Sequence, residues 1–164
     1  MDVMPLAQVK ALLIIASQLS GYPVPNLPPP IVTEVSLAEM SKESCGGDDP
    51  ASKAMCNVLG FYEWPMYPGD TVRAGAPASP RPERLWIRSD SQEDADTVAI
   101  HELTHWLQFH NGFHPMKCPQ SFLIEYQAYT VTWIYKVKYK HVAIPDDYDV
   151  PGVNCSTQPP QVVK

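Results

Sequence analysis

Two histidines, His101 and His105, stand four residues apart in the stretch VAIHELTHWLQ, residues 98 to 108, and Glu102 follows the first directly. On an α-helix such histidines share one face, about 6 Å apart along the axis, and both can turn a ring nitrogen toward one metal ion. Glu102 lies about 100° round the helix, where a carboxylate can accept a proton from a metal-activated water. The HExxH pattern therefore predicts two zinc ligands, His101 and His105, and a general base, Glu102.

A catalytic zinc site needs a third protein ligand and leaves the fourth position open to water. Glu125, which stands 20 residues after His105, is the best candidate, because a turn at Asn111-Gly112 lets its helix fold back across the first. An apolar stripe is expected to flank Glu125 on the inner side of that helix: Phe122, Tyr126, Tyr129, Trp133 and Val137. A lone carboxylate is costly to bury, and no Lys or Arg stands beside it on that face, so the sequence predicts that Glu125 binds the metal.

The motif His101-Glu102-Leu103-Thr104-His105 with a later helical glutamate resembles the gluzincins, the thermolysin-like branch of the zinc metallopeptidases. The spacing to Glu125 is the thermolysin-like one, and uncharged residues stand where the motif expects them: Val98, Ile100, Leu103 and Leu107. The resemblance covers roughly residues 57 to 133. It implies a minimal zincin-like fold, one bound Zn²⁺ ion and hydrolysis of peptide bonds. It also implies that a peptide or protein substrate pairs in extended form with an edge strand at residues 57 to 64, beside an inner strand at 85 to 88.

The chain departs from that pattern one turn after Glu125. Thermolysin-like enzymes have an Asp there, which orients a metal-bound His, whereas this chain has Tyr129. The partners that orient the ligands are therefore expected to be built differently. The donor that would stabilise an oxyanion has no motif of its own, and the candidates are Tyr129, His114, His141 and Tyr148. A catalytically weak or inactive zinc-binding module of the same shape is the alternative to a peptidase.

The elements that must position these residues are those of a single α+β domain, residues 1 to 164, in which a small, mostly antiparallel sheet packs on an active-site helix and a glutamate helix. An N-terminal helix is expected within residues 1 to 21, followed by a Pro-rich connector at 22 to 30. The inner side of that helix should consist of Leu6, Val9, Leu12, Leu13, Ala16 and Leu19. Residues 31 to 93 should form the sheet and loops.

Three strands are expected in that region, at residues 31 to 35, 57 to 64 and 85 to 88. A capping box, Ser36 with Glu39, predicts a small helix ending by Gly46, and residues 65 to 82 form a long Pro/Gly-rich excursion. Residues 94 to 140 should form the two ligand-bearing helices, and residues 141 to 164 an irregular tail.

Within the ligand-bearing helices, the acidic residues at 90 to 96 suit the N-terminus of the first helix, Asn111-Gly112 ends it, and Pro119 opens the second. Trp106 and Gln108 are expected to face away from the ion, toward neighbouring elements. His110 is expected at the surface.

Composition excludes two classes of partner. The chain has 164 residues and a formal net charge of -6, which argues against nucleic acid, since phosphates demand a basic face. The longest apolar run near the N-terminus, residues 11 to 16, is far shorter than the roughly 20 residues of a membrane span. No membrane insertion is therefore expected.

Four cysteines allow three disulfide pairings. Chain order favours Cys45 with Cys56 and Cys118 with Cys155, while a zinc site built from all four thiolates competes without a CxxC pair to support it. An even number of cysteines in a small Pro-rich chain favours an oxidising compartment, so a secreted or periplasmic location is expected, although no signal peptide is recognisable in the chain. A cytoplasmic protein with free thiols is the alternative.

Overall fold

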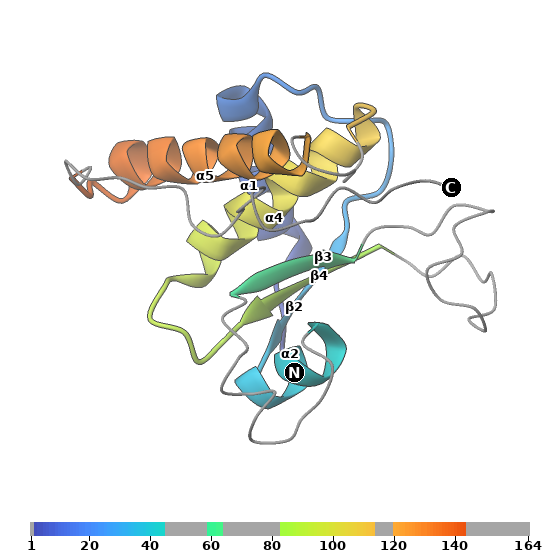
Figure 1. The fold of residues 1–164 in the computed structure, drawn as a ribbon, viewed down its shortest axis with the longest axis vertical. Coiled ribbons are helices and arrows are strands. Elements are labelled where there is room, and N and C mark those ends of the chain that lie inside the picture. The colour runs from blue at the N-terminus through green and yellow to red at the C-terminus, as the bar shows by residue number, and fades with distance from the viewer. Residues whose placement is uncertain (1, 45–58, 64–82, 114–119, 144–164) are drawn as a thin grey trace, which may run out of the picture.

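The computed structural model describes residues 2–44, 59–63, 83–113 and 120–143. Within these residues it has helices and a small mixed sheet, which confirms the α+β class (Figure 1). The elements run in the order β1 (Asp2–Val3), α1 (Leu6–Ser20), β2 (Ile31–Val35), α2 (Leu37–Ser44), β3 (Gly60–Glu63), β4 (Arg84–Arg88), α4 (Ala95–His110) and α5 (Gln120–Tyr139).

Several predictions from the sequence lie outside the described residues. They concern both disulfides and the alternative thiolate site, the excursion at 65–82, the helix start at Pro119, the tail from residue 144, and the candidates His114 and Tyr148.

The sheet has the strand order β1-β2-β4-β3. β1 and β3 pair antiparallel with their neighbours, and β2 pairs parallel with β4. The prediction of an edge strand at 57–64 beside an inner strand at 85–88 is confirmed for the described part, because β3 lies at the edge and β4 lies inside. β1 was not predicted: its two residues are too few to show an alternating pattern.

The two faces of the sheet pack against different helices. Side chains alternate along β4, so Leu85 and Ile87 point to one face and Trp86 to the other. Leu85 and Ile87 belong to the main core with α1, α4 and α5, whereas Trp86 joins a smaller cluster with Met40 of α2. Figure 1 shows this layering: α4 runs along one face of the sheet, with α1 and α5 beyond it, and α2 covers the other face.

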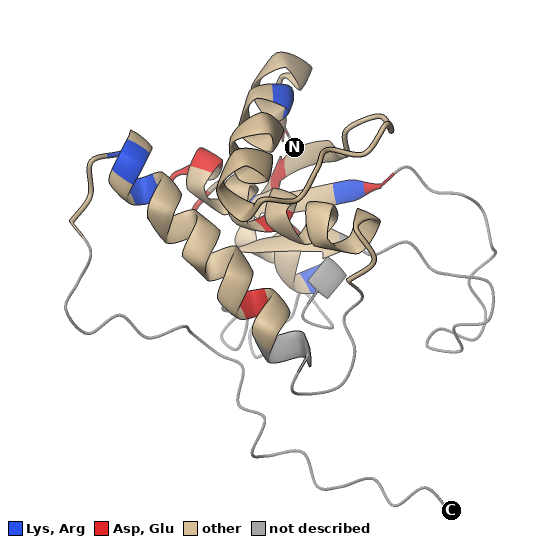
Figure 2. Cartoon of the chain, turned by 90° about the horizontal axis from the view of Figure 1, so that it is seen from above, with Lys and Arg blue, Asp and Glu red and all other residues tan. Residues whose placement is uncertain are grey.

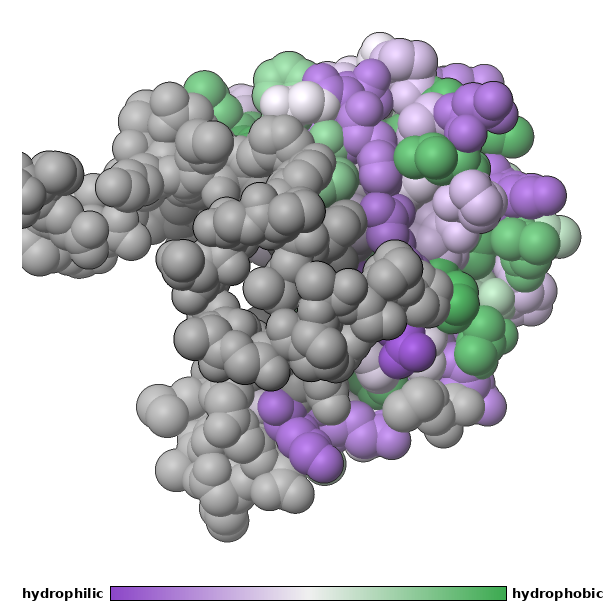
Figure 3. All heavy atoms as spheres, turned by 90° about the vertical axis from the view of Figure 1, so that its right-hand side faces the viewer, coloured by the Kyte–Doolittle hydropathy of each residue, from purple (hydrophilic) through white to green (hydrophobic). Residues whose placement is uncertain are grey.

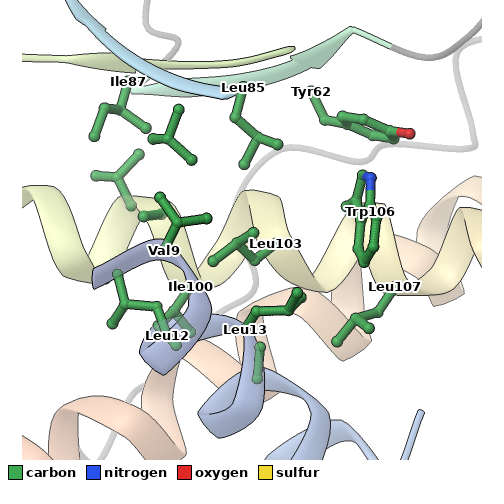
Figure 4. Close-up of a cluster of buried hydrophobic side chains, with 14 of the residues drawn as sticks. Val9, Leu12, Leu13, Tyr62, Leu85, Ile87, Ile100, Leu103, Trp106 and Leu107 are labelled. Carbon is green, nitrogen blue, oxygen red and sulfur yellow. The ribbon is translucent and has the colours of Figure 1, made fainter. Parts of the chain in front are cut away.

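The centre of the main core is the interface between α4 and the sheet. In Figure 4 the side chains of Leu85 and Tyr62 descend from the strands toward Leu103 and Trp106 of α4, and Leu13 approaches from α1. All five side chains belong to one buried cluster. This contact fixes α4, which carries the HExxH motif, relative to the edge strand β3.

The predicted inner face of α1 is correct except at its ends. Val9, Leu12, Leu13 and Ala16 are buried, and Gly21 ends the helix with a positive φ of 78°. Leu6, however, is 57% exposed, because it is the first helical residue and precedes the first buried one by almost a turn, while Leu19 is only partly buried against the core.

The apolar stripe predicted on α5 is wrong. Tyr126 is 49% and Val137 38% exposed, and Tyr129 and Trp133 are only half-buried. The side chain of Phe122 lies outside the described part. The buried residues are instead Ile124, Ala128, Val131 and Tyr135. Three of these four, Ile124, Ala128 and Val131, have small or branched side chains, which allow close packing of one helix on another.

Asp94 ties the start of α4 to the end of α5. Its carboxylate accepts a hydrogen bond from the Thr97 backbone N–H as the N-cap of α4. It also lies 3.0 Å from the Lys140 ammonium, among the basic residues that Figure 2 shows at one end of α5. Partial burial would raise the pKa of Asp94, but hydrogen bonds from Thr97 and Lys140 outweigh that effect and lower it.

Asp94→Ala is expected to lower the free energy of unfolding by about 1 kcal/mol at pH 7, the usual cost of a lost N-cap. Because the pKa of Asp94 is depressed by folding, its contribution is present above the unfolded pKa of about 4 and is lost as the pH falls through the folded value. Asp94→Asn keeps a capping oxygen and should retain most of the stability at pH 7. Urea unfolding at pH 7 and pH 3 measures this, and a deficit in Asp94→Ala that is as large at pH 3 as at pH 7 would contradict it.

None of the helices in the described ranges combines the length and apolar character needed to cross a membrane. On the face in Figure 3, hydrophilic and hydrophobic side chains of the described residues are interspersed.

Candidate metal centre

α4 is enclosed by the sheet on one side and by α1 and α5 on others. Every residue from Thr97 to Phe109 except His101 is therefore buried, including five polar or charged ones, Thr97, Glu102, Thr104, His105 and Gln108. Polar groups in such a place need partners. His101 and His105 find theirs on α5, which crosses α4 at this point.

Three ligand atoms meet between α4 and α5. The Nε2 atoms of His101 and His105 lie 3.1 Å apart. The two carboxylate oxygens of Glu125 lie 3.4 Å from the Nε2 of His101 and 3.3 Å from the Nε2 of His105. Ligand atoms placed tetrahedrally around one zinc ion at ~2.0 Å would be about 3.3 Å apart. The spacing of the three side chains thus fits a single zinc ion.

Gln108 determines which nitrogen of His105 carries the proton. The Nε2 of Gln108 donates to the backbone carbonyl of Ile124 at 2.9 Å, so its Oε1 must be the atom that lies 2.9 Å from the Nδ1 of His105. An amide oxygen can only accept, so the Nδ1 of His105 is protonated. In the neutral ring, Nε2 then presents a lone pair to the cluster.

Thr132 likewise determines which ring nitrogen of His101 carries the proton. Its hydroxyl donates its one proton to the Ala128 carbonyl at 2.8 Å, which leaves an oxygen lone pair facing the Nδ1 of His101 at 3.4 Å. The Nδ1 of His101 is therefore the donor, and its Nε2 also presents a lone pair. Metal-binding histidines are typically oriented in this way by a partner on the second ring nitrogen.

The cluster attracts positive charge. Burial alone would lower the pKa of His105, but the hydrogen bond to Glu125 and the charges of Glu102 and Glu125 outweigh it and raise the pKa. Burial would likewise raise the pKa of Glu125, and its hydrogen bonds to His101 and His105 hold it far below the usual range. Two imidazole lone pairs and a carboxylate at these distances repel one another unless a cation, either a proton or a metal ion, lies among them.

Glu102 lies on the side of α4 that faces the edge strand. It is 5% exposed, and burial raises its pKa, against the lowering effect of His101 and His105. The backbone N–H of Tyr62 in β3 donates a hydrogen bond to its carboxylate. A buried carboxylate whose pKa is raised toward neutrality is better suited to take and return a proton than an exposed one.

Gly60 allows β3 to approach Glu102 closely. A Cβ atom at this position would lie 2.6 Å from the Oε1 of Glu102 and 2.7 Å from a methyl carbon of Val98, distances that real structures do not tolerate. The edge strand and the carboxylate are therefore in direct contact only because residue 60 lacks a side chain.

Gly60→Ala is expected to lower the rate of any reaction that depends on Glu102 by about 10²-fold, the typical cost of displacing a catalytic group by about 1 Å. Zinc content should stay unchanged, because the atoms nearest to an added Cβ belong to Glu102 and Val98 rather than to the three ligand side chains. Steady-state kinetics with elemental analysis measure both quantities. A fully active Gly60→Ala protein would mean that the contact does not matter.

Of the two oxyanion candidates that lie within the described residues, Tyr129 and His141, it is Tyr129 that lies at the cluster. Its ring lies 4.5 Å from the ring of His101, edge to face. Burial and the negative charges of Glu125 and Glu102 raise its pKa, so its hydroxyl keeps its proton and can donate. His141 is exposed beyond the far end of α5, about 20 Å along the helix from Glu125, and does not reach the cluster.

Two further residues of α4 contact the carboxylate of Glu83, beside the sheet. Trp106 faces away from the cluster, as predicted, and its indole N–H donates to the carboxylate of Glu83. His110 is not a free surface residue, because its Nε2 lies 3.0 Å from the same carboxylate.

Sequence reasoning missed Gln108 and Thr132. The prediction that Gln108 faces away from the ligands is wrong, because its amide is bonded to His105. Its position three residues after His105, on the same side of the helix, could have indicated this. Thr132 lies two helical turns after Glu125, and that spacing was the only available signal.

A comparison of the chain with models of protein families, with curated proteins and with solved structures found no match.

Proposed function

We propose that this protein is a zinc-dependent peptidase of the gluzincin type, with His101, His105 and Glu125 as the metal ligands and Glu102 as the general base. The observation that carries the proposal is the convergence of two imidazole lone pairs and a carboxylate at spacings close to those around tetrahedral zinc. A buried glutamate that follows the first ligand accompanies them. Two imidazole nitrogens, which are ligands of intermediate softness, together with one carboxylate suit zinc better than magnesium or calcium.

A zinc ion held by these residues would lower the pKa of a water molecule and polarise the scissile carbonyl group. Glu102 would accept a proton from the water as its oxygen bonds to the carbonyl carbon, and would pass that proton to the amine nitrogen as the C–N bond breaks. Its burial keeps bulk water from competing for the proton, and the Tyr62 N–H orients its carboxylate. Tyr129, which stays protonated, donates a hydrogen bond to the oxyanion that develops.

The edge strand β3 is the proposed seat of an extended peptide or protein substrate. The Arg88 N–H donates to the Leu59 carbonyl at 2.8 Å. Hydrogen-bonding direction alternates along antiparallel strands, so the backbone groups of Phe61 also face β4, and those of Gly60 and Tyr62 point away from β4. A substrate strand can pair with the outward N–H and carbonyl of Gly60 and with the outward carbonyl of Tyr62, whose N–H already donates to Glu102. Such pairing would lay the peptide beside Glu102, which touches both residues.

Metal analysis, chelation and a digest of a peptide library test the proposal. We expect one zinc ion per chain, cleaved peptides identified by mass spectrometry, and loss of cleavage on chelation before loss of fold. Circular dichroism would follow the fold. A zinc ion whose removal unfolds the domain, in a chain that cuts no peptide, would instead identify a structural module. A chain that binds no zinc would refute the proposal.

A further inference from the structure

Gln108 is a fully buried amide placed where α4 and α5 cross. Its Oε1 accepts from the Nδ1 of His105 at 2.9 Å. Its Nε2 donates to the Ile124 carbonyl at 2.9 Å and to the Oε1 of Gln127 at 3.1 Å. Each end of the amide therefore has partners on a different helix.

The α5 partner of Gln108 adjoins a ligand. Ile124 immediately precedes Glu125, so the carbonyl that Gln108 holds belongs to the peptide unit that joins Ile124 to Glu125. The same amide thus holds the imidazole of one ligand and the backbone beside another. A shift of α5 along α4 would break the Gln108–Ile124 hydrogen bond and move Glu125 away from the two histidines at the same time.

The hydrogen-bond network of Gln108 extends beyond α5. The Oε1 of Gln127 also accepts from the hydroxyl of Tyr22, at 2.7 Å. Tyr22 belongs to the Pro-rich connector after α1, and its ring packs on Phe113 at a centroid distance of 5.2 Å. Both acceptors of the Gln108 amide are thereby held in place, one by the α5 backbone and one by the connector.

We propose that Gln108 is a positioning residue that sets the register of α5 on α4, and so holds His105 and Glu125 at metal-binding distance from each other. The inference rests on the proposed zinc site and adds to it the residue that unites ligands from two helices. Thr132, by contrast, is hydrogen-bonded to one ligand, His101, at a longer distance of 3.4 Å, and its hydroxyl donates to the Ala128 carbonyl of its own helix.

Gln108→Met, which has a similar length and no hydrogen-bonding amide, is the test. Outer partners of ligands typically contribute 10- to 100-fold to metal affinity, and we expect a loss at the upper end, about 100-fold, for Gln108→Met and a smaller loss for Thr132→Val. Competition with a chromophoric chelator at one pH measures the zinc affinity of the full chain. The visible spectrum of the Co²⁺ form should change as well, because the ligand geometry changes.

The control is Leu12→Ala, which opens the main core from α1 and, because leucine is apolar, removes no hydrogen-bond partner of the ligands. It should lower the unfolding temperature and leave both the zinc affinity and the Co²⁺ spectrum of the folded protein unchanged. If Gln108→Met bound zinc as tightly as the wild type, or if Leu12→Ala weakened binding equally, the positioning role would be overturned while the zinc site stood. A wild-type chain without zinc affinity would overturn the proposed function, and this inference with it.

Discussion

Glu102→Gln is expected to reduce peptide hydrolysis by about 10²- to 10⁴-fold, the contribution that general acid–base groups typically make. The substitution preserves the size of the side chain, and its amide oxygen can still accept from the Tyr62 N–H. An amide cannot take up a proton at neutral pH, so the attacking water loses its base. Zinc content should remain at the wild-type level, because Glu102 is not among the three clustered ligand residues.

Kinetics on a peptide identified from the library digest would measure this loss, with elemental analysis of the same sample. Glu93→Gln is a matched control, since Glu93 pairs with Lys136 at the surface end of α5 and does not approach the cluster. Wild-type activity in Glu102→Gln would remove Glu102 from the mechanism. Loss of zinc together with activity would mean that Glu102 acts as a metal ligand rather than as the general base.

Glu125→Gln is expected to release the zinc ion. Two imidazoles alone leave the site without its only negatively charged ligand, and a neutral amide oxygen is a poor substitute. The loss of affinity should exceed the 10- to 100-fold that removal of an outer hydrogen-bond partner causes. Activity should fall with zinc occupancy, and high zinc concentrations should restore part of it.

Dialysis against a chelator followed by elemental analysis measures the retained zinc. Glu34→Gln, on β2 and away from the ligand cluster, serves as the control and should retain it. Undiminished affinity in Glu125→Gln would exclude Glu125 as a ligand. That result would refute the gluzincin assignment even if Glu102→Gln behaved as expected.

The local part of the site could be predicted from the sequence because one helix determines it. The relative positions of His101, Glu102 and His105 follow from helical geometry alone, whatever α4 packs against. The boundaries of α4 were equally accessible, since Asp94 caps its start and Asn111-Gly112 ends it. In α4 the capping residues and the helical spacing of the HExxH motif therefore indicate the same element.

The contribution of α5 depends on tertiary packing, which the sequence pattern does not contain. The juxtaposition of Glu125 with the histidines was predicted, but from the wrong stripe of α5. Two stripes of apolar residues run along this helix, and the buried one is not the predicted aromatic stripe but the set Ile124, Ala128, Val131 and Tyr135. Glu125 borders both stripes, so the error did not change its expected direction.

The hydrogen-bond partners of buried polar side chains could not be predicted from the sequence either. A glutamine inside a helix shows no preference for one neighbour until the crossing helix is placed, and Gln108 binds a carbonyl 16 residues away. The parallel pairing of β2 with β4 has the same origin, because it joins segments about 50 residues apart. Such contacts are non-local and leave no periodic signal.

The unequal burial of the three proposed ligands has a kinetic consequence. His101 and His105 stand on a helix enclosed by the core, with side chains 14% and 8% exposed, so their withdrawal from an ion requires a larger local opening than that of Glu125. Glu125 stands on the outermost helix, with its side chain 34% exposed. Exchange of the ion with its surroundings would therefore begin at the carboxylate, and the stiffness of α5 would govern how long the ion resides.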